Sequence, residues 1–239
     1  MQKQRPRVLT AKEARELLAG EAAPEKARDM SRFFKTGPGE YAEGDVFWGI
    51  GAPRMRAAAA AAVALPLPEV ERLLEDPVHE VRACALVIMT LRFKKGDETQ
   101  RGEIIDLYLR RADRVNNWDL VDISAGMLGE WLLRRDRAVL RRLADSPILW
   151  RQRIAVVATL PLIKAGDFTD ILDLTRRLIR HPHDLMHKAL GWMLREVGKK
   201  DKAALETFLE HHVHDLARTT LRYAIERFPE AERKAWLQR

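Results

Sequence analysis

The chain has 239 residues, of which 46% are hydrophobic and 32% are charged. This apolar content can form a sizeable core, and no segment approaches the roughly 18 uninterrupted apolar residues that a transmembrane helix needs. Lysine and arginine outnumber aspartate and glutamate by 42 to 35, and the resulting net charge of +7 favours a polyanionic partner such as a nucleic acid.

The amino-terminal residues 1–20 are basic, but they lack the apolar core and small-residue cleavage site of a signal peptide. We therefore expect a cytoplasmic protein. The single cysteine, Cys84, lies in an apolar helical run and no catalytic thiol motif surrounds it. We expect Cys84 to be a buried structural thiol.

Helical periodicity covers most of the chain, and strand patterns are scarce. In chain order, the predicted helices span residues 10–18, 23–34, 53–64, 68–74, 78–93, 99–114, 118–134, 138–144, 149–165, 168–181, 184–199, 202–212, 216–228 and 229–237. Proline and glycine between them predict short connections. The long exception, residues 35–53, is rich in glycine and holds Tyr41, Phe47 and Trp48. We expect it to be an ordered connector held by these aromatic residues, because its glycine spacing fits no phosphate-binding motif.

Five similar segments recur about every 35 residues, a period typical of two-helix solenoid repeats. They begin at Val81, Trp118, Arg151, Met186 and Ala217. The sequence therefore predicts an all-α fold: a curved α-solenoid of HEAT-like antiparallel helix pairs in a single domain over residues 1–239, with helical extensions at residues 1–22 and 229–239. Each segment should open the second helix of a pair, and these helices should line one concave surface. The residues expected on that surface are Arg82, Trp118, Asp122, Arg151, Arg153, Lys188, Trp192, Arg195, Arg218 and Arg222.

Two pairs, each made of one tryptophan and one charged residue, stand out on the predicted second helices. Trp118 and Asp122 are four residues apart, and Trp192 and Arg195 are three apart, so each pair shares a helix face. Indole rings attract cations and a carboxylate stabilises positive charge, which suits a cationic substrate on a polyanionic carrier. A purely structural alternative stays open: Asn117 caps the helix, Asp119 complements its dipole, and the indoles pack in the core.

Other catalytic patterns are absent from the sequence. His183 and His187 are four residues apart, but no HExxH motif and no third ligand accompany them, so we expect no metal site. No nucleophile elbow of the GxSxG type occurs either.

Five ordered segments carry a family resemblance: MSRFFKTGPGEY, GDVFWGIGAPRMR, NNWDLVD, LWRQRIAVV and KALGWMLRE. Together, over residues 26–228, they resemble the bacterial DNA-alkylation-repair glycosylases of the AlkD type. This resemblance implies a HEAT-like solenoid that binds duplex DNA in its concave face. It also implies hydrolysis of the N-glycosidic bond of positively charged N3- or N7-alkylated purines.

The resemblance assigns roles to individual residues. Asp122 matches the catalytic aspartate, and Trp118 and Trp192 match the indoles that contact the lesion nucleotide. Arg153 and Arg195 match arginines at the DNA surface, and we expect the other basic residues of the concave surface to contact phosphates: Arg151, Lys188, Arg218 and Arg222. Some relatives have a second tryptophan where this chain has Asn117, which implies a narrower aromatic wall.

The resemblance places no lysine as a Schiff-base nucleophile, so we expect a monofunctional enzyme that does not couple strand cleavage to base loss. We also expect no cofactor and no metal. We expect a monomer without an obligate protein partner, associated with the bacterial nucleoid when bound to DNA. Two other functions stay open: a non-catalytic HEAT-repeat protein that binds distorted or branched DNA, and a HEAT scaffold for another protein.

Overall fold

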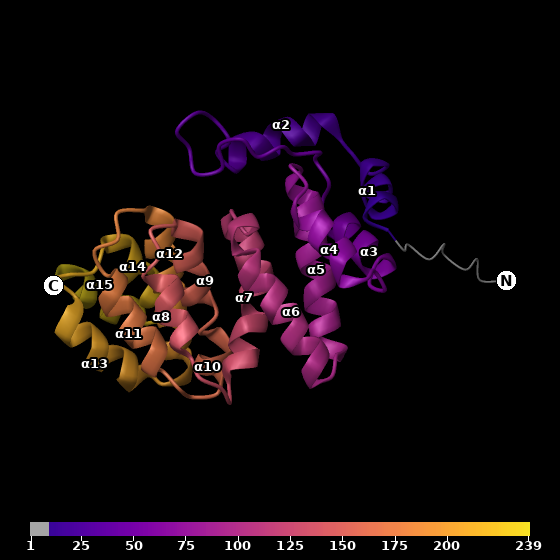
Figure 1. The fold of residues 1–239 in the computed structure, drawn as a ribbon. Coiled ribbons are helices and arrows are strands. Elements are labelled where there is room, and N and C mark those ends of the chain that lie inside the picture. Colours follow the sequence, from indigo (N-terminus) through magenta and orange to yellow (C-terminus); the bar gives the residue numbers. More distant parts are fainter. Residues whose placement is uncertain (1–9) are drawn as a thin grey trace. The chain divides into compact units, whose positions relative to one another are not determined.

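A computed structural model of the chain describes residues 10–239 (Figure 1). Over these residues the fold is helices and loops, with an isolated β-bridge between Val46 and Val78. The all-α prediction is therefore confirmed, and the part of the predicted amino-terminal extension before residue 10 lies outside the described residues. The chain divides into two compact units, one ending at Ser124 and the other beginning at Ala125, a boundary that falls inside one helix.

The first unit is built around one long buried helix. Its helices are α1 (Ala11–Ala19), α2 (Pro24–Phe33), α3 (Ala52–Ala61), α4 (Leu67–Leu74), α5 (His79–Lys95), α6 (Glu98–Arg110), the short 3₁₀ helix η1 (Ala112–Arg114) and the first turns of α7 (Trp118–Leu132). α5 is in contact with α3, α4 and α6. It is consequently buried around most of its circumference, and its residues Cys84 and Met89 are fully inaccessible. Burial raises the pKa of the Cys84 thiol to about 12, which fits the predicted structural role.

The connector between α2 and α3 is ordered, as predicted. Phe47 is buried. The carboxylate of Glu80 accepts hydrogen bonds from the backbone N–H groups of Trp48, Gly49 and Ile50 at 2.8 to 3.1 Å. Gly49 has φ +79°, and a β-carbon there would lie 2.2 Å from the carbonyl oxygen of Ala23, so only glycine fits. Glu80 and Gly49 thus fix the connector beside the start of α5.

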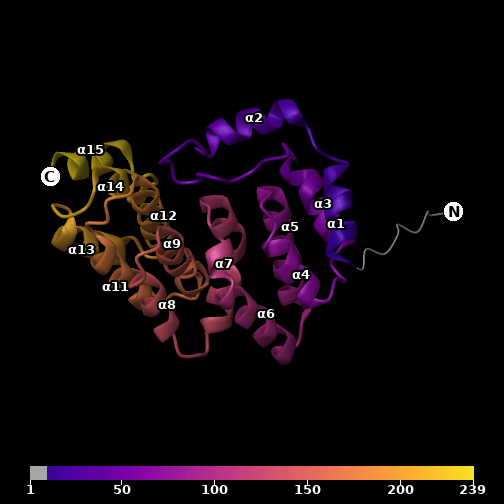
Figure 2. The ribbon, with the colours of Figure 1, turned by 45° about the horizontal axis from the view of Figure 1, so that its top comes forward.

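The second unit shows the two layers of a solenoid. It contains the end of α7 and α8 (Ala138–Ala144), α9 (Leu149–Val157), α10 (Leu160–Lys164), α11 (Thr169–Leu178), α12 (Asp184–Lys200), α13 (Lys202–His212), α14 (Arg218–Ala224) and α15 (Glu230–Gln238). α12 lies between α9 and α14 (Figure 2), while α8 is in contact with α11. Second helices of successive pairs therefore pack on one another, as the repeat predicts, and α15 occupies the predicted carboxy-terminal extension.

Some helix boundaries differ from the predictions, and one difference falls where proline interrupts a pattern. The predicted helix over residues 149–165 is two helices, because Pro161 has no N–H to continue the bonding of α9 into α10. The Oγ1 of Thr159 accordingly turns back to the carbonyl of Val156 at 2.6 Å. No helix among residues 10–239 is both long enough and apolar enough to cross a membrane.

Candidate active site

A cavity of about 420 Å³ opens within the first unit where α3, α5 and α7 meet. It is lined by Arg56 from α3, by Val87, Thr90, Leu91 and Lys94 from α5, and by Trp118, Asp119, Asp122 and Ile123 from α7. Trp118 and Asp122 therefore share one cavity, as their four-residue spacing predicts. Arg56 and Lys94 are exposed, so the same cavity also carries positive charge.

Asn117 begins the helix that carries these groups. Its carbonyl oxygen accepts the N–H of Val121 at 3.1 Å, and its side-chain Oδ1 accepts the N–H of Trp118 at 2.8 Å. The side chain is fully buried, and its Nδ2 donates to Asp45 Oδ2 at 3.4 Å. Asn117 thus accepts hydrogen bonds from N–H groups in the first turn of α7, and it does not line the cavity.

Trp118 is supported from behind by an aromatic cluster. Its indole is stacked on Phe34, with ring centroids 5.3 Å apart and planes at 17°, and meets the edge of Phe33 at 6.0 Å. Phe34 in turn is stacked on Phe47 at 4.9 Å. Since Phe34 and Phe47 are buried, the orientation of the half-buried indole is fixed by core packing.

A buried ionic network lies beneath the aromatic cluster. His79 Nε2 is 2.8 Å from Asp119 Oδ2, and His79 Nδ1 is 3.2 Å from Asp45 Oδ2. Asp45 Oδ1 also accepts a hydrogen bond from Arg82 Nη2 at 2.6 Å. The network thus joins three parts of the first unit. Asp45 belongs to the connector between α2 and α3, His79 and Arg82 belong to α5, and Asp119 lines the cavity.

The position of Arg82 corrects the prediction that it lies on the concave surface. Arg82 is 1% exposed, and its guanidinium also donates to the backbone carbonyls of Asp76 and Pro77 at 3.0 and 2.9 Å. The connector supplies Asp45 as a counter-ion, so the charge can be buried. Arg82 is therefore a structural residue.

The surroundings of His79 and Asp45 favour the charged form of each. Burial opposes the charged form of His79, but the hydrogen bonds to Asp119 and Asp45 outweigh it and raise the histidine pKa. Burial likewise opposes ionisation of Asp45, but the hydrogen bond from His79 and the charge of Arg82 outweigh it and lower the carboxyl pKa. Two cations and two anions thus compensate one another next to the cavity.

The other predicted pair, Trp192 with Arg195, lies in the second unit, on α12. Trp192 is half-buried, and Arg195 forms an ion pair with Glu226. Gly191 precedes the indole and permits a close approach of α14, since a β-carbon there would lie 2.7 Å from the carbonyl oxygen of Thr220. Lys188, one turn before Trp192, pairs with Asp184 at 2.9 Å.

The predicted DNA-contacting arginines of the second unit differ in exposure. Arg218 and Arg222 are exposed, and Arg151 is partly exposed. Arg153 is 5% exposed and donates to the carbonyl oxygen of Leu185 at 2.6 Å, so it lies deeper than the surface position that the resemblance implies. Its guanidinium links α9 to the start of α12.

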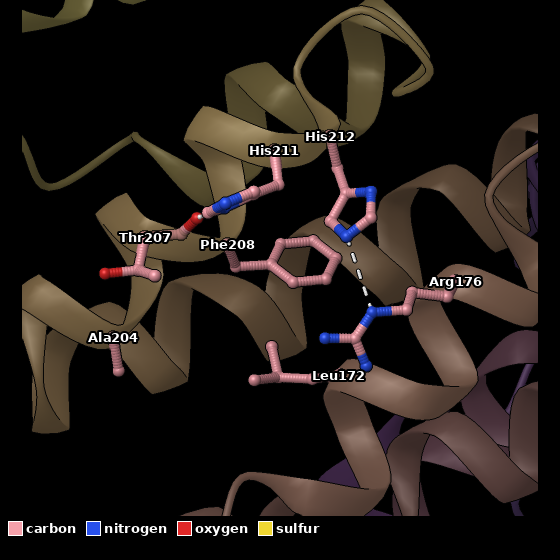
Figure 3. Close-up of a pocket in the computed structure, with 7 residues that line it drawn as sticks. All are labelled: Leu172, Arg176, Ala204, Thr207, Phe208, His211 and His212. Carbon is pink, nitrogen blue, oxygen red and sulfur yellow. Dashed lines mark hydrogen bonds between the residues drawn. The ribbon is translucent and has the colours of Figure 1, made fainter.

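A second cavity lies between α11 and α13, and its lining is shown in Figure 3. Arg176 lies over the ring of Phe208 at 5.5 Å, and its Nε donates to His212 Nε2 at 3.4 Å. Burial, with the nearby charge of Arg176, lowers the pKa of His212. No carboxylate lines this cavity, so it lacks the group that would stabilise a cationic intermediate.

Asp45, His79 and Arg82 have no recognisable sequence motif. Asp45 and His79 are separated by 34 residues, and His79 and Asp119 by 40. Of the four residues of the network, only Asp119 has a local sequence feature, because it is an acidic residue in the first turn of a predicted helix. Its position in the lining of the cavity depends on the fold.

The fold and the cavity define a class: a helical-repeat protein whose first unit holds an indole and a carboxylate in one cavity. The sequence matches the family described as DNA alkylation repair enzyme over residues 14–228, and the chain belongs to this family. Among solved structures it is similar to a predicted DNA alkylation repair enzyme from Enterococcus faecalis, with a TM-score of 0.70 and 18% identity over 88% of this chain and 98% of that one. No curated protein matches the sequence. The family resemblance is thus confirmed.

Proposed function

We propose that the protein is a monofunctional DNA glycosylase that hydrolyses the N-glycosidic bond of positively charged N3- or N7-alkylated purines in duplex DNA. The observation that carries the proposal is the presence of Trp118 and Asp122 in one cavity that Arg56 and Lys94 also line. Membership in a DNA alkylation repair family supports DNA as the carrier of the cationic group.

The proposed chemistry depends on the charge of the substrate. Alkylation at N3 or N7 makes the purine cationic, so the base takes the electrons of the C1′–N bond with it and leaves as a neutral molecule. No general acid is therefore required. The positive charge moves to the deoxyribose, which becomes an oxocarbenium-like cation.

Asp122 is the proposed stabiliser of that cation. A fixed carboxylate beside the sugar lowers the energy of the transition state, and one such preorganised contact contributes on the order of 3 kcal/mol. Water then adds to C1′, and its proton passes through the carboxylate to solvent. The products are the free base and an intact strand with an abasic deoxyribose.

The indoles and the basic residues bind the substrate in this proposal. Trp118 contacts the cationic nucleotide through its ring face, an interaction of about 0.5 to 2 kcal/mol. Trp192 is proposed to contact the same nucleotide on the basis of the resemblance. Phosphate contacts are assigned to the more accessible basic residues of the second unit, Arg151, Lys188, Arg195, Arg218 and Arg222, which makes binding sensitive to salt. Arg153, which the resemblance implies at the DNA surface, is left out because it is buried.

The decisive experiment is a base-release assay with Asp122→Asn. Methylated duplex DNA is incubated with the protein, and free 3-methyladenine and 7-methylguanine are separated by chromatography. We expect release by the wild-type protein, a loss of about 100-fold or more in the variant, and unchanged affinity for the duplex. Asp113→Asn, at an exposed position of the same unit, is the matched control.

Two results would contradict the proposal. Equal release by Asp122→Asn and wild type would remove the carboxylate from the mechanism. Tight DNA binding without release by the wild type would instead favour the non-catalytic protein that binds distorted or branched DNA.

A further inference from the structure

We infer that the cavity between α11 and α13 binds a small organic molecule through a phosphate monoester group, with Arg176 as the main anion contact. The cavity has a volume of about 720 Å³, and all of its lining residues belong to these two helices of the second unit. Sites for small molecules commonly have volumes of about 300 to 1,000 Å³. The cavity can therefore hold an organic ligand, and it is separate from the proposed active site.

The first observation is that the positive charge of Arg176 is not compensated. The guanidinium lies over the ring of Phe208 at 5.5 Å, and its Nε donates to His212 Nε2 at 3.4 Å. Neither of these partners carries a negative charge. Within residues 10–239, no carboxylate forms an ion pair with Arg176, and no carboxylate lines the cavity. Arg176 is thus held in position by groups that leave its charge intact.

The neighbouring arginines show that this arrangement is specific to Arg176. Arg177, the next residue, bonds to Asp173 Oδ2 at 3.1 Å, and Arg180 bonds to Asp215 Oδ1 at 2.8 Å. Acidic partners are therefore available along this face of the unit. The side chain of Arg176 instead extends into a cavity without acids, which favours an anionic ligand there.

The second observation is the direction of the remaining donors. Figure 3 shows the two Nη atoms of Arg176 turned away from His212, on the side of Leu172. These two groups can donate to two oxygens of one anion. On the facing helix, His211 Nδ1 donates to the carbonyl oxygen of Thr207 at 2.7 Å, so Nε2 is the ring nitrogen that is left for a ligand.

The number of donors favours a phosphate monoester over a carboxylate. The two Nη groups of Arg176 and the Nε2 of protonated His211 make three donors, which match the three terminal oxygens of a monoester. A monoester carries a charge of about −1.5 to −2 at pH 7, and this charge favours the protonated form of the imidazole. Leu172 and Ala204 supply an apolar wall for the organic part of the ligand.

The position of the cavity separates it from the proposed DNA contacts. α11 and α13 are first helices of their pairs, whereas Arg195 lies on α12 and Arg218 and Arg222 lie on α14, which are second helices. Figures 1 and 2 both show α11 and α13 on one side of the second unit and α14 on the other. We therefore assign the cavity to a small molecule and not to the backbone of duplex DNA.

The test is a titration of the full chain with phenyl phosphate, followed through the NMR signals of the His211 and His212 imidazoles. We expect saturable shifts of both signals. Inorganic phosphate should produce similar shifts with an affinity about tenfold lower, because it lacks a group that contacts the apolar wall.

The pKa of His212 gives a second readout. Burial and the charge of Arg176 lower this pKa, and so does neighbouring His211. Asp215 acts in the opposite direction, but it is bonded to Arg180. A bound phosphate should offset the charge of Arg176, so we expect phenyl phosphate to raise the pKa of His212 by about 1.

Two sets of variants separate ligand binding from folding. Arg176→Gln should weaken phenyl phosphate binding about tenfold or more, while Arg177→Gln, outside the cavity, should bind as wild type. Ala204→Glu adds a carboxylate to the cavity wall and leaves Arg176 in place, so it should abolish binding. Its neutral counterpart, Ala204→Gln, should retain most of the affinity. The Ala204 pair provides the test if Arg176→Gln lowers the melting temperature.

Three results would overturn the inference. The first is the absence of saturable shifts in the wild type, or wild-type affinity in both Arg176→Gln and Ala204→Glu. The second is equal affinity for phenyl phosphate and inorganic phosphate, which would exclude an organic ligand. The third is displacement of phenyl phosphate by a duplex without terminal phosphates, which would assign the cavity to DNA. No residue of the cavity has a role in the proposed base release, so failure of the glycosylase assay would leave this site standing.

Discussion

His79 joins two carboxylates that belong to different parts of the chain, the connector and α7. It lies beneath the aromatic cluster at 1% exposure, with Asp119 on one ring nitrogen and Asp45 on the other. Both interactions reach their full strength only when the imidazole is protonated. The protonation state of one buried ring therefore controls how firmly the start of α7 is held.

This dependence predicts an alkaline loss of stability. The pKa of His79 is raised above its ordinary value of 6.5, so its contribution is fully present below pH 6.5 and is lost as pH rises through the raised value. Asp45, whose pKa is lowered from 3.8, contributes above pH 3.8 and loses that contribution as pH falls through the lowered value. We expect His79→Gln to cost about 3 kcal/mol near pH 5.5, and less at pH 9. Urea unfolding of both proteins at a series of pH values measures this difference, and a pH-independent difference would contradict it.

Asn117 gives a second prediction for a single residue. The side chain of Asn117 is fully buried and bonded to Asp45. Asn117→Trp should therefore overpack the site and remove the hydrogen bond, at a cost of about 3 kcal/mol. Thermal unfolding measures the cost. The control, Phe33→Trp, adds an indole at an exposed position and should leave stability near wild type.

At the scale of elements, the contact between α12 and α14 depends on a glycine. A β-carbon on Gly191 would lie 2.7 Å from a backbone oxygen and 2.5 Å from the Cβ of Tyr223. Alanine would gain about 1 kcal/mol of helix propensity, but the backbone cannot yield cheaply, and overpacking of this kind costs about 1 to 3 kcal/mol. We expect Gly191→Ala to lower the free energy of unfolding.

Gly126 in α7 is the matched control for this substitution. A β-carbon at Gly126 meets nothing within 4 Å, so Gly126→Ala should raise stability by about 1 kcal/mol through helix propensity alone. Denaturant unfolding of the two variants compares the effects directly. Equal shifts in the same direction would show that propensity, and not the approach of α14, decides both.

Most elements were predictable because their limits are local. Thr10 and Asp97 each form a capping box with the residue three positions later, and such pairs are visible in the sequence. The break between α9 and α10 was not predicted, because the apolar pattern of the segment continues through Pro161. The repeat of about 35 residues predicted the packing of second helices because that spacing sets their neighbours.

At the scale of the whole molecule, the excess of positive charge predicts salt-sensitive DNA binding. The net charge is +7, and each neutralised phosphate contributes a slope of about −0.9 in log affinity against log salt. Replacing exposed Arg218 and Arg222 together with alanine should reduce the slope by about 2. Fluorescence anisotropy over a range of salt concentrations measures it, and an unchanged slope would exclude both residues from the interface.

Arg153 should behave differently from these exposed arginines. Because it is buried and donates to a backbone carbonyl, we expect Arg153→Ala to lower stability more than it changes the salt slope. Thermal unfolding together with the same anisotropy series separates the two effects. A full loss of one slope unit at unchanged melting temperature would instead support a direct phosphate contact.

The site was predictable only where its residues are close in the sequence. Trp118 and Asp122 could be placed together because a helix brings residues four apart to one face. Arg82 was predicted on a surface from its repeat position, but its burial depends on Asp45, which lies 37 positions earlier in an irregular segment. Side chains that meet through a loop leave no period or motif in the sequence.

Asp45 makes the connector more than a link between α2 and α3. The last residues of this loop bind Glu80, and its Asp45 lies at the start of α7. There the carboxylate accepts hydrogen bonds from the side chains of Asn116 and Asn117. A change in loop length would therefore alter the seating of the helix that carries Trp118 and Asp122, even with every cavity residue retained.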